Sequence, residues 1–65
     1  MKINKTKLTL AMANACVSIN DIAKKSKVSR VSIGRFLSGK TEPKPATIGK
    51  IAKALNVKVE DLIEN

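Results

Sequence analysis

The chain has 65 residues, a formal net charge of +8 and one cysteine, and it contains no histidine, tyrosine or tryptophan. This length limits it to a single domain over residues 1–65 with a small hydrophobic core. A lone cysteine excludes a disulfide framework within the chain, as is usual in a reducing cytoplasm. We find no metal-ligand cluster, nucleophile–base pair or phosphate-binding loop. We therefore expect no catalytic residues, no metal, no cofactor and no small-molecule ligand.

The positive charge is concentrated in the first two thirds of the chain. Residues 1–40 carry nine lysines and arginines and one acidic residue, Asp21, whereas residues 41–65 carry four residues of each sign. This one-sided distribution favours a polyanionic partner such as a nucleic acid. The alternative, a basic surface that only keeps the protein soluble, is typical of scattered lysines rather than of such a segregated charge.

The first sixteen residues combine a lysine-rich start with the stretch LTLAMANAC, which weakly resembles a lipoprotein signal that ends at Cys16. Thr9 and Asn14 interrupt the apolar run, whereas secretory signals need about 7–15 apolar residues. We therefore predict an ordinary helix here and Cys16 as a small buried residue at its end. No stretch is long enough to span a membrane.

This first helix is expected over residues 5–15, with Asn4 as its N-cap and residues 1–4 as a frayed arm. Four apolar residues share one helical face: Leu8, Ala11, Met12 and Ala15. Lys5 and Lys7 lie in the first turn, where positive charge opposes the helix dipole. A helix whose start faces a phosphate would gain from that placement.

Residues 18–39 predict two short helices joined by a tight turn. Ser18 and Ser29 can cap helices over residues 19–26 and 30–38, and Gly39 can end the second of them. The apolar residues have helical spacing and comprise Ile19, Ile22, Ala23, Val28, Ile33, Phe36 and Leu37. This is the layout of a helix-turn-helix, whose second helix lies in the DNA major groove.

A loop with two prolines follows, and Pro45 suits the first position of a fourth helix that continues over residues 46–55. Asn56 can close this helix in a left-handed conformation. A short fifth helix is expected over residues 59–63, where four apolar residues recur: Val57, Val59, Leu62 and Ile63. Because no strand pattern is present, we predict an all-α fold with five helices around one core.

Two pieces of the chain, INDIAKKSKVSRVSIGRFLSGK and TIGKIAKALNVKVEDLIE, occur on either side of the proline-bearing loop. In this arrangement the chain resembles the lambda-repressor-like, Cro/Xre-type helix-turn-helix proteins of phages and mobile elements. The first piece alone also resembles a LacI-type headpiece, but those headpieces begin at the helix-turn-helix and have no full helix before it. The resemblance implies a compact five-helix lambda-repressor-like domain that binds operator DNA.

The chain departs from the family pattern at three places. A buried arginine–glutamate pair of many members is replaced by Met12 and Leu37, which avoids an uncompensated buried charge at a cost of about 3–5 kcal/mol. The usual turn glycine is Lys27, which costs on the order of 1 kcal/mol if its φ is positive, unless the turn geometry differs. The phosphate-contacting glutamine is Ile19, so that contact is limited to the free N–H groups of the helix N-terminus.

The second helix of the motif carries five candidate base-contacting residues. Arg30, in its first turn, can donate two hydrogen bonds to guanine, and Val31 can contact a thymine methyl group. Ser32 can face a base, a phosphate or its own helix, and Arg35 suits a base or a phosphate equally. Gly34 costs about 0.5–1 kcal/mol relative to alanine in a helix interior. Two explanations of this glycine stay open, namely close approach to DNA and tight packing against the preceding helix.

Phosphate contacts are expected from helix N-termini and from lysines around the motif. The candidates are Ser18, Ile19, Ser29, Lys27, Lys40, Thr41, Lys5 and Lys7. Lys40 and Thr41 occupy the loop with which the family clamps the DNA backbone. Such contacts add affinity and salt dependence but carry no sequence information.

The expected function is that of a sequence-specific transcriptional regulator, a repressor of a bacterium, phage or mobile element, which binds a double-stranded DNA operator in the cytoplasm. A domain of this size usually needs a homodimer for useful specificity. The apolar C-terminal segment can supply that interface or can belong to the core of its own chain. Two alternatives are an antitoxin that also binds a protein partner and an architectural or recombination accessory factor.

Overall fold

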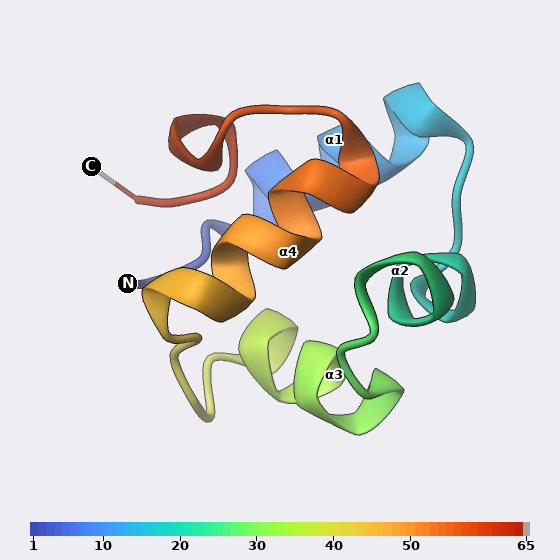
Figure 1. The fold of residues 1–65 in the computed structure, drawn as a ribbon. Helices are drawn as coiled ribbons and strands as arrows, with labels where there is room; N and C mark the ends of the chain where they lie inside the picture. Colours follow the sequence, from blue (N-terminus) through green and yellow to red (C-terminus); the bar gives the residue numbers. More distant parts are fainter. Residues whose placement is uncertain (65) are drawn as a thin grey trace.

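The computed structural model describes residues 1–64, and over these residues it is all-helical, as predicted (Figure 1). The elements are α1 (Lys5–Ala15), α2 (Ile19–Ser26), α3 (Arg30–Ser38), α4 (Pro45–Leu55) and the 3-10 turn η1 (Val59–Asp61). The first four helices are confirmed. The fifth helix expected over residues 59–63 is wrong in extent, since only one 3-10 turn forms there.

The helix ends follow the local signals in the sequence. The side chains of Asn4, Ser18 and Ser29 each accept a hydrogen bond from a backbone N–H in the first turn of α1, α2 and α3. Gly39 and Asn56 end α3 and α4 in left-handed conformations, with φ of 77° and 57°. These five predictions are confirmed, because each depends on contacts within a single helical turn.

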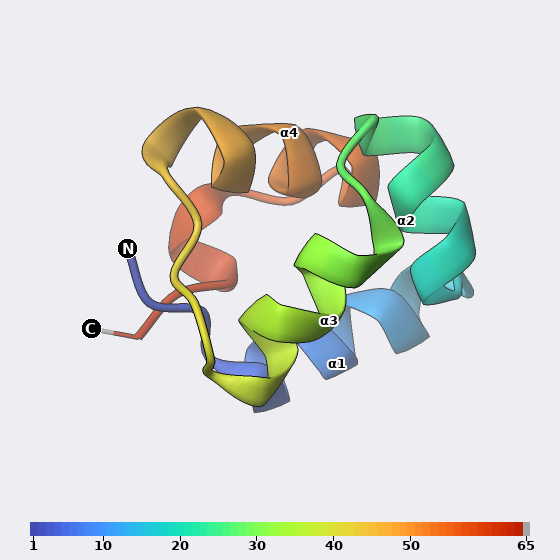
Figure 2. The same ribbon diagram turned by 90° about the horizontal axis from the view of Figure 1, so that it is seen from below.

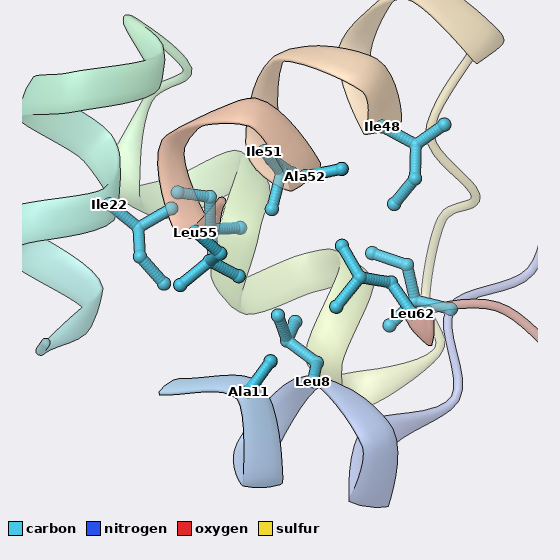
Figure 3. Close-up of a cluster of buried hydrophobic side chains, with 10 residues drawn as sticks. Leu8, Ala11, Ile22, Ile48, Ile51, Ala52, Leu55 and Leu62 are labelled. Carbon is cyan, nitrogen blue, oxygen red and sulfur yellow. The ribbon is translucent and has the colours of Figure 1, made fainter. Parts of the chain in front are cut away.

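The hydrophobic core is centred on α4, which packs against α1, α2 and η1 (Figures 1 and 3). The buried residues of the cluster come from every element except η1 and are Ile3, Leu8, Ala11, Ile22, Ile33, Ile48, Ile51, Ala52, Leu55 and Leu62. The helix α3 packs against α2. The helix α3 is therefore supported by α2 and, through Ile33, by the core.

The N-terminal residues are not the frayed arm that we expected. The side chain of Ile3 is only 7% exposed, and its backbone forms an antiparallel β-bridge with Ile63. The N–H of Asn4 also donates to the carbonyl of Leu62 at 2.8 Å. Both termini therefore support one another beside the core (Figure 1).

The end of α1 also differs from the prediction. Cys16 is exposed rather than buried, because it adopts a left-handed conformation with φ of 55° that turns the chain out of the helix. Its N–H donates to Ala13, and the N–H of Val17 donates to Met12, which is the hydrogen-bond pattern of a Schellman motif. Ala15 is exposed too, so the inward face of α1 ends earlier than its apolar spacing predicted.

Met12 and Leu37 stand where many family members have the ion pair. Met12 and Leu37 are both partly buried and pack against the core cluster. Within residues 1–64, no buried side-chain nitrogen or oxygen lacks a hydrogen-bond partner. The exchange of both members therefore leaves no unsatisfied polar group behind.

Candidate nucleic-acid interface

The helix α3 presents one face to the core and the opposite face to solvent. Ile33 is fully buried, and Phe36 and Leu37 pack against the core, whereas the side of α3 away from the core lies on the near side of the molecule in Figure 2. All five predicted base-contacting residues lie on this one helix. Arg30, Val31 and Arg35 are exposed, and Ser32 and Gly34 are partly buried.

Val31 is the most unusual residue of this surface. It is 67% exposed, the largest value among the exposed large hydrophobic residues of the described chain. Arg30 and Arg35 lie nearby on the same helix and form no ion pair with any described residue. Two guanidinium groups without an ion-pair partner among the described residues, together with an exposed valine, suit a partner that offers both hydrogen-bond acceptors and methyl groups.

The first turn of α3 is held by a pair of serines. The hydroxyl of Ser29 accepts from the N–H of Ser32 at 3.1 Å and donates to the hydroxyl of Ser32 at 2.8 Å. The proton of Ser29 is therefore used inside the protein, so a phosphate contact at this residue would use its N–H. The hydroxyl proton of Ser32 has no acceptor in these two bonds and can be donated outward.

The residue that ends α2 adopts a left-handed conformation although it is not a glycine. Lys27 has φ of 60°, a left-handed conformation, and its side chain is exposed. The positive φ that we considered for Lys27 is therefore present, at a cost of about 1–2 kcal/mol for a residue with a Cβ atom.

Replacing Lys27 with glycine is expected to stabilise the fold by about 0.5–1 kcal/mol, because glycine adopts this φ without strain. The same change should lower the slope of DNA affinity against salt concentration by about 1, the effect of one phosphate contact. Lys27→Asn is the matched control, because asparagine tolerates the left-handed region and also removes the charge. A less stable Lys27→Gly protein, in thermal unfolding, would contradict this account.

The N-terminus of α2 is closed by a reciprocal capping box. The N–H and the hydroxyl of Ser18 both donate to the carboxylate of Asp21, at 2.9 and 3.0 Å, and the N–H of Asp21 donates back at 3.2 Å. These hydrogen bonds from Ser18, with smaller contributions from the neighbouring lysines Lys24 and Lys25, lower the pKa of Asp21. Both donors of Ser18 are engaged, which argues against the phosphate contact expected there.

Asp21 should therefore make the stability of the fold sensitive to acid. Because its folded pKa is lowered, the stabilisation is present above the ordinary pKa of about 4 and is lost as the pH falls through the folded value. We expect Asp21→Asn to lose less thermal stability than the wild type between about pH 5 and about pH 2. Glu60→Gln, which removes an exposed carboxylate elsewhere, is the control. Parallel curves for wild type and Asp21→Asn would contradict the prediction.

The side chain of Ile19 does not replace the family's glutamine, since it is partly buried and packs against the core. Its N–H, in the first turn of α2, remains suited to a phosphate. Lys40 and Thr41 are both exposed directly after Gly39, where α3 ends. Ile19, Lys40 and Thr41 therefore remain candidates for phosphate contacts.

The two lysines at the start of α1 have different surroundings. The ammonium of Lys7 donates to the carbonyls of Ile63 and Glu60 at 3.1 and 3.5 Å, so it fastens the C-terminal segment. This role, which depends on a contact between the two ends of the chain, argues against the expected phosphate contact. Lys5 is exposed and remains a candidate.

The fold also gathers lysines that the sequence did not connect. Lys25 of α2 lies beside Lys50 and Lys53 of α4 around a shallow groove that Ser26 and Ala54 complete. Because these residues are far apart in sequence, no pattern in the sequence indicates that they lie together.

Over residues 1–64, no group of three or more acidic, histidine or cysteine residues could hold a metal ion, and no helix is long and apolar enough to cross a membrane.

A compact helical core with α2 and an exposed, arginine-bearing α3 joined by a tight turn defines a helix-turn-helix DNA-binding domain. A model of the family described as helix-turn-helix matches residues 17–62, and the chain belongs to this family as a DNA-binding transcriptional regulator. The resemblance noted from the sequence is thereby confirmed.

Among solved structures, the chain is similar to the restriction-modification controller protein C.AhdI from Aeromonas hydrophila, with a TM-score of 0.80 and 21% sequence identity. The alignment covers 88% of this chain and 86% of that chain, so the two share nearly the whole fold. A search of curated proteins finds no match.

Proposed function

We propose that the protein is a sequence-specific repressor that places α3 in the major groove of a double-stranded DNA operator and blocks transcription there. It acts without enzymatic activity, in the cytoplasm of a bacterium or in the host of a phage or mobile element. The observation that supports this most directly is the outer face of α3, where Arg30, Val31 and Arg35 are exposed. These side chains suit base edges in the major groove, which combine acceptors with thymine methyl groups.

The proposed DNA contacts are of two kinds, to bases and to phosphates. Arg30, Val31, Ser32, Gly34 and Arg35 face the bases, and Ile19, Ser29, Lys27, Lys40, Thr41 and Lys5 are the candidates for the phosphates. Ser18 and Lys7 leave this set because their donors are engaged inside the protein. Phosphate contacts on both sides of α3 would set its orientation, and the base contacts would set the sequence.

The protein is proposed to act as one domain that forms a homodimer on DNA. Leu62 of the C-terminal segment is fully buried, so this residue belongs to the core of its own chain. Val57, Val59 and Ile63 are only partly buried, and Val57 lines a shallow groove together with the exposed Leu10. A two-fold dimer predicts a palindromic operator with half-sites about 34–36 Å apart.

The proposal is tested by selecting binding sites from random duplexes with the wild-type protein. We expect enrichment of one palindromic sequence and protection of its guanine N7 atoms, which lie in the major groove, from methylation. Equal recovery of all sequences would contradict the proposal. Strong bending of DNA without sequence preference would favour the architectural alternative, and a second protein that co-purifies in a fixed ratio would favour the antitoxin.

A further inference from the structure

Gly34 lies in the middle of α3, a position where glycine weakens a helix relative to alanine. Its φ is not positive; among the described glycines only Gly39 has a positive φ, of 77°. The backbone conformation of α3 therefore gives no reason for a glycine at this position.

Packing gives no reason either. A Cβ atom added to Gly34 would meet no other atom of the protein within 4 Å. Tight packing against α2, one of the two explanations considered from the sequence, is thereby excluded. Alanine would fit the isolated protein at this position and would strengthen the helix, so neither backbone conformation nor packing within the chain accounts for the glycine.

The position of Gly34 indicates what lies there. Val31, Gly34 and Ser38 follow one another at helical spacings of three and four residues, so they form a line along α3, on the side away from the buried Ile33. Val31 and Ser38 are exposed, and this line contains no long side chain. Arg30 and Arg35 lie to either side of it. A partner can therefore approach the backbone of α3 closely between two arginines.

We propose that Gly34 is a positioning residue for base recognition, in that its missing side chain lets α3 lie close enough to the bases for Val31 to contact a thymine methyl group. This inference rests on the proposed function. Dispersion contacts weaken steeply when a gap of 0.5–1 Å opens. A single methyl group at Gly34 would push α3 away from the base edges and would weaken the contacts of Val31 and the two arginines together.

The test compares Gly34→Ala with Gly49→Ala, a matched control on α4 where an added Cβ atom also meets nothing within 4 Å. Both variants should raise the melting temperature, by about 2–8 °C. Only Gly34→Ala should lose affinity for the site that the wild type selects, by about tenfold or more, with less than about a twofold change on random duplex. A variant that unfolded would not show the raised melting temperature, so misfolding cannot imitate this result.

The methyl contact is tested by replacing thymine with uracil, which lacks the C5-methyl group, at each position of the selected site. One such replacement should weaken binding of the wild type and of Gly49→Ala, and it should not weaken Gly34→Ala further. Equal affinity of Gly34→Ala and wild type for the selected site would overturn the inference while leaving the proposed function intact. Failure of the wild type to select any site would overturn both.

Discussion

Arg30→Ala is expected to remove one base preference from each half-site and to lower affinity by about 1–3 kcal/mol per half-site, roughly 5- to 150-fold each. Arg30 is the first residue of α3. In helix-turn-helix proteins the N-terminal residues of this helix contact the base edges. Its side chain is exposed and forms no ion pair with residues 1–64. The guanidinium group can therefore donate two parallel hydrogen bonds to guanine without giving up an internal partner. Site selection with the variant measures the lost preference.

Arg30→Lys is the matched control for this prediction. Lysine keeps the positive charge but lacks the planar pair of donors that guanine accepts. If Arg30 contacts a base, the lysine variant should lose the same preference as the alanine variant. If lysine restores binding, or if Arg30→Ala weakens all sequences equally, Arg30 contacts a phosphate instead, and the same experiment on Arg35 then becomes the test for base recognition.

Leu62→Ala is expected to destabilise the fold by about 2–5 kcal/mol, which is the usual cost of emptying a fully buried leucine site. The stability of natural domains is about 5–15 kcal/mol, and a chain this short belongs near the lower end. Leu62 is fully buried, and its carbonyl accepts from the N–H of Asn4. The variant should therefore be largely unfolded near body temperature, as measured by circular dichroism.

Leu10→Ala provides the control, because Leu10 is 58% exposed on α1 and the change has the same chemistry. A surface substitution of this kind should alter stability by no more than about 0.5 kcal/mol. Equal melting temperatures of the two variants would contradict the role assigned to Leu62. A loss of DNA affinity in Leu10→Ala at unchanged stability would instead indicate that Leu10 belongs to the dimer interface.

Much of the fold could be predicted because its signals are local. Serine caps, a helix-ending glycine and apolar residues at helical spacing act within one or two turns. The wrong predictions about the fold all concern the ends of the chain or the C-terminal ends of helices. Ile3 is buried and pairs with Ile63 from the opposite end of the chain, and Cys16 is turned outward by a left-handed conformation. A periodic pattern of apolar residues carries no information about the pairing of Ile3 or about the conformation of Cys16.

In the candidate site, too, local features could be predicted from the sequence and contacts between distant residues could not. The sequence identified α3 and its exposed arginines, since their spacing relative to the apolar face follows from helical geometry. It also proposed Ser18 and Lys7 for phosphates, and the structure engages both residues internally. The lysine groove around Lys25 and Lys50 was missed because it joins two helices whose proximity only the folded chain creates.

Three features could be read from the sequence alone: the order and bounds of α1 to α4, the membership of the helix-turn-helix class and the concentration of positive charge in residues 1–40. These follow from hydrogen bonds and helical periodicity between residues near one another in the chain. The folded chain was needed to show that Ile3 and Ile63 form a β-bridge and that Gly34 has no packing role. Those outcomes depend on which surfaces meet when the helices close around α4, and this is set by the summed packing of residues that are distant in sequence.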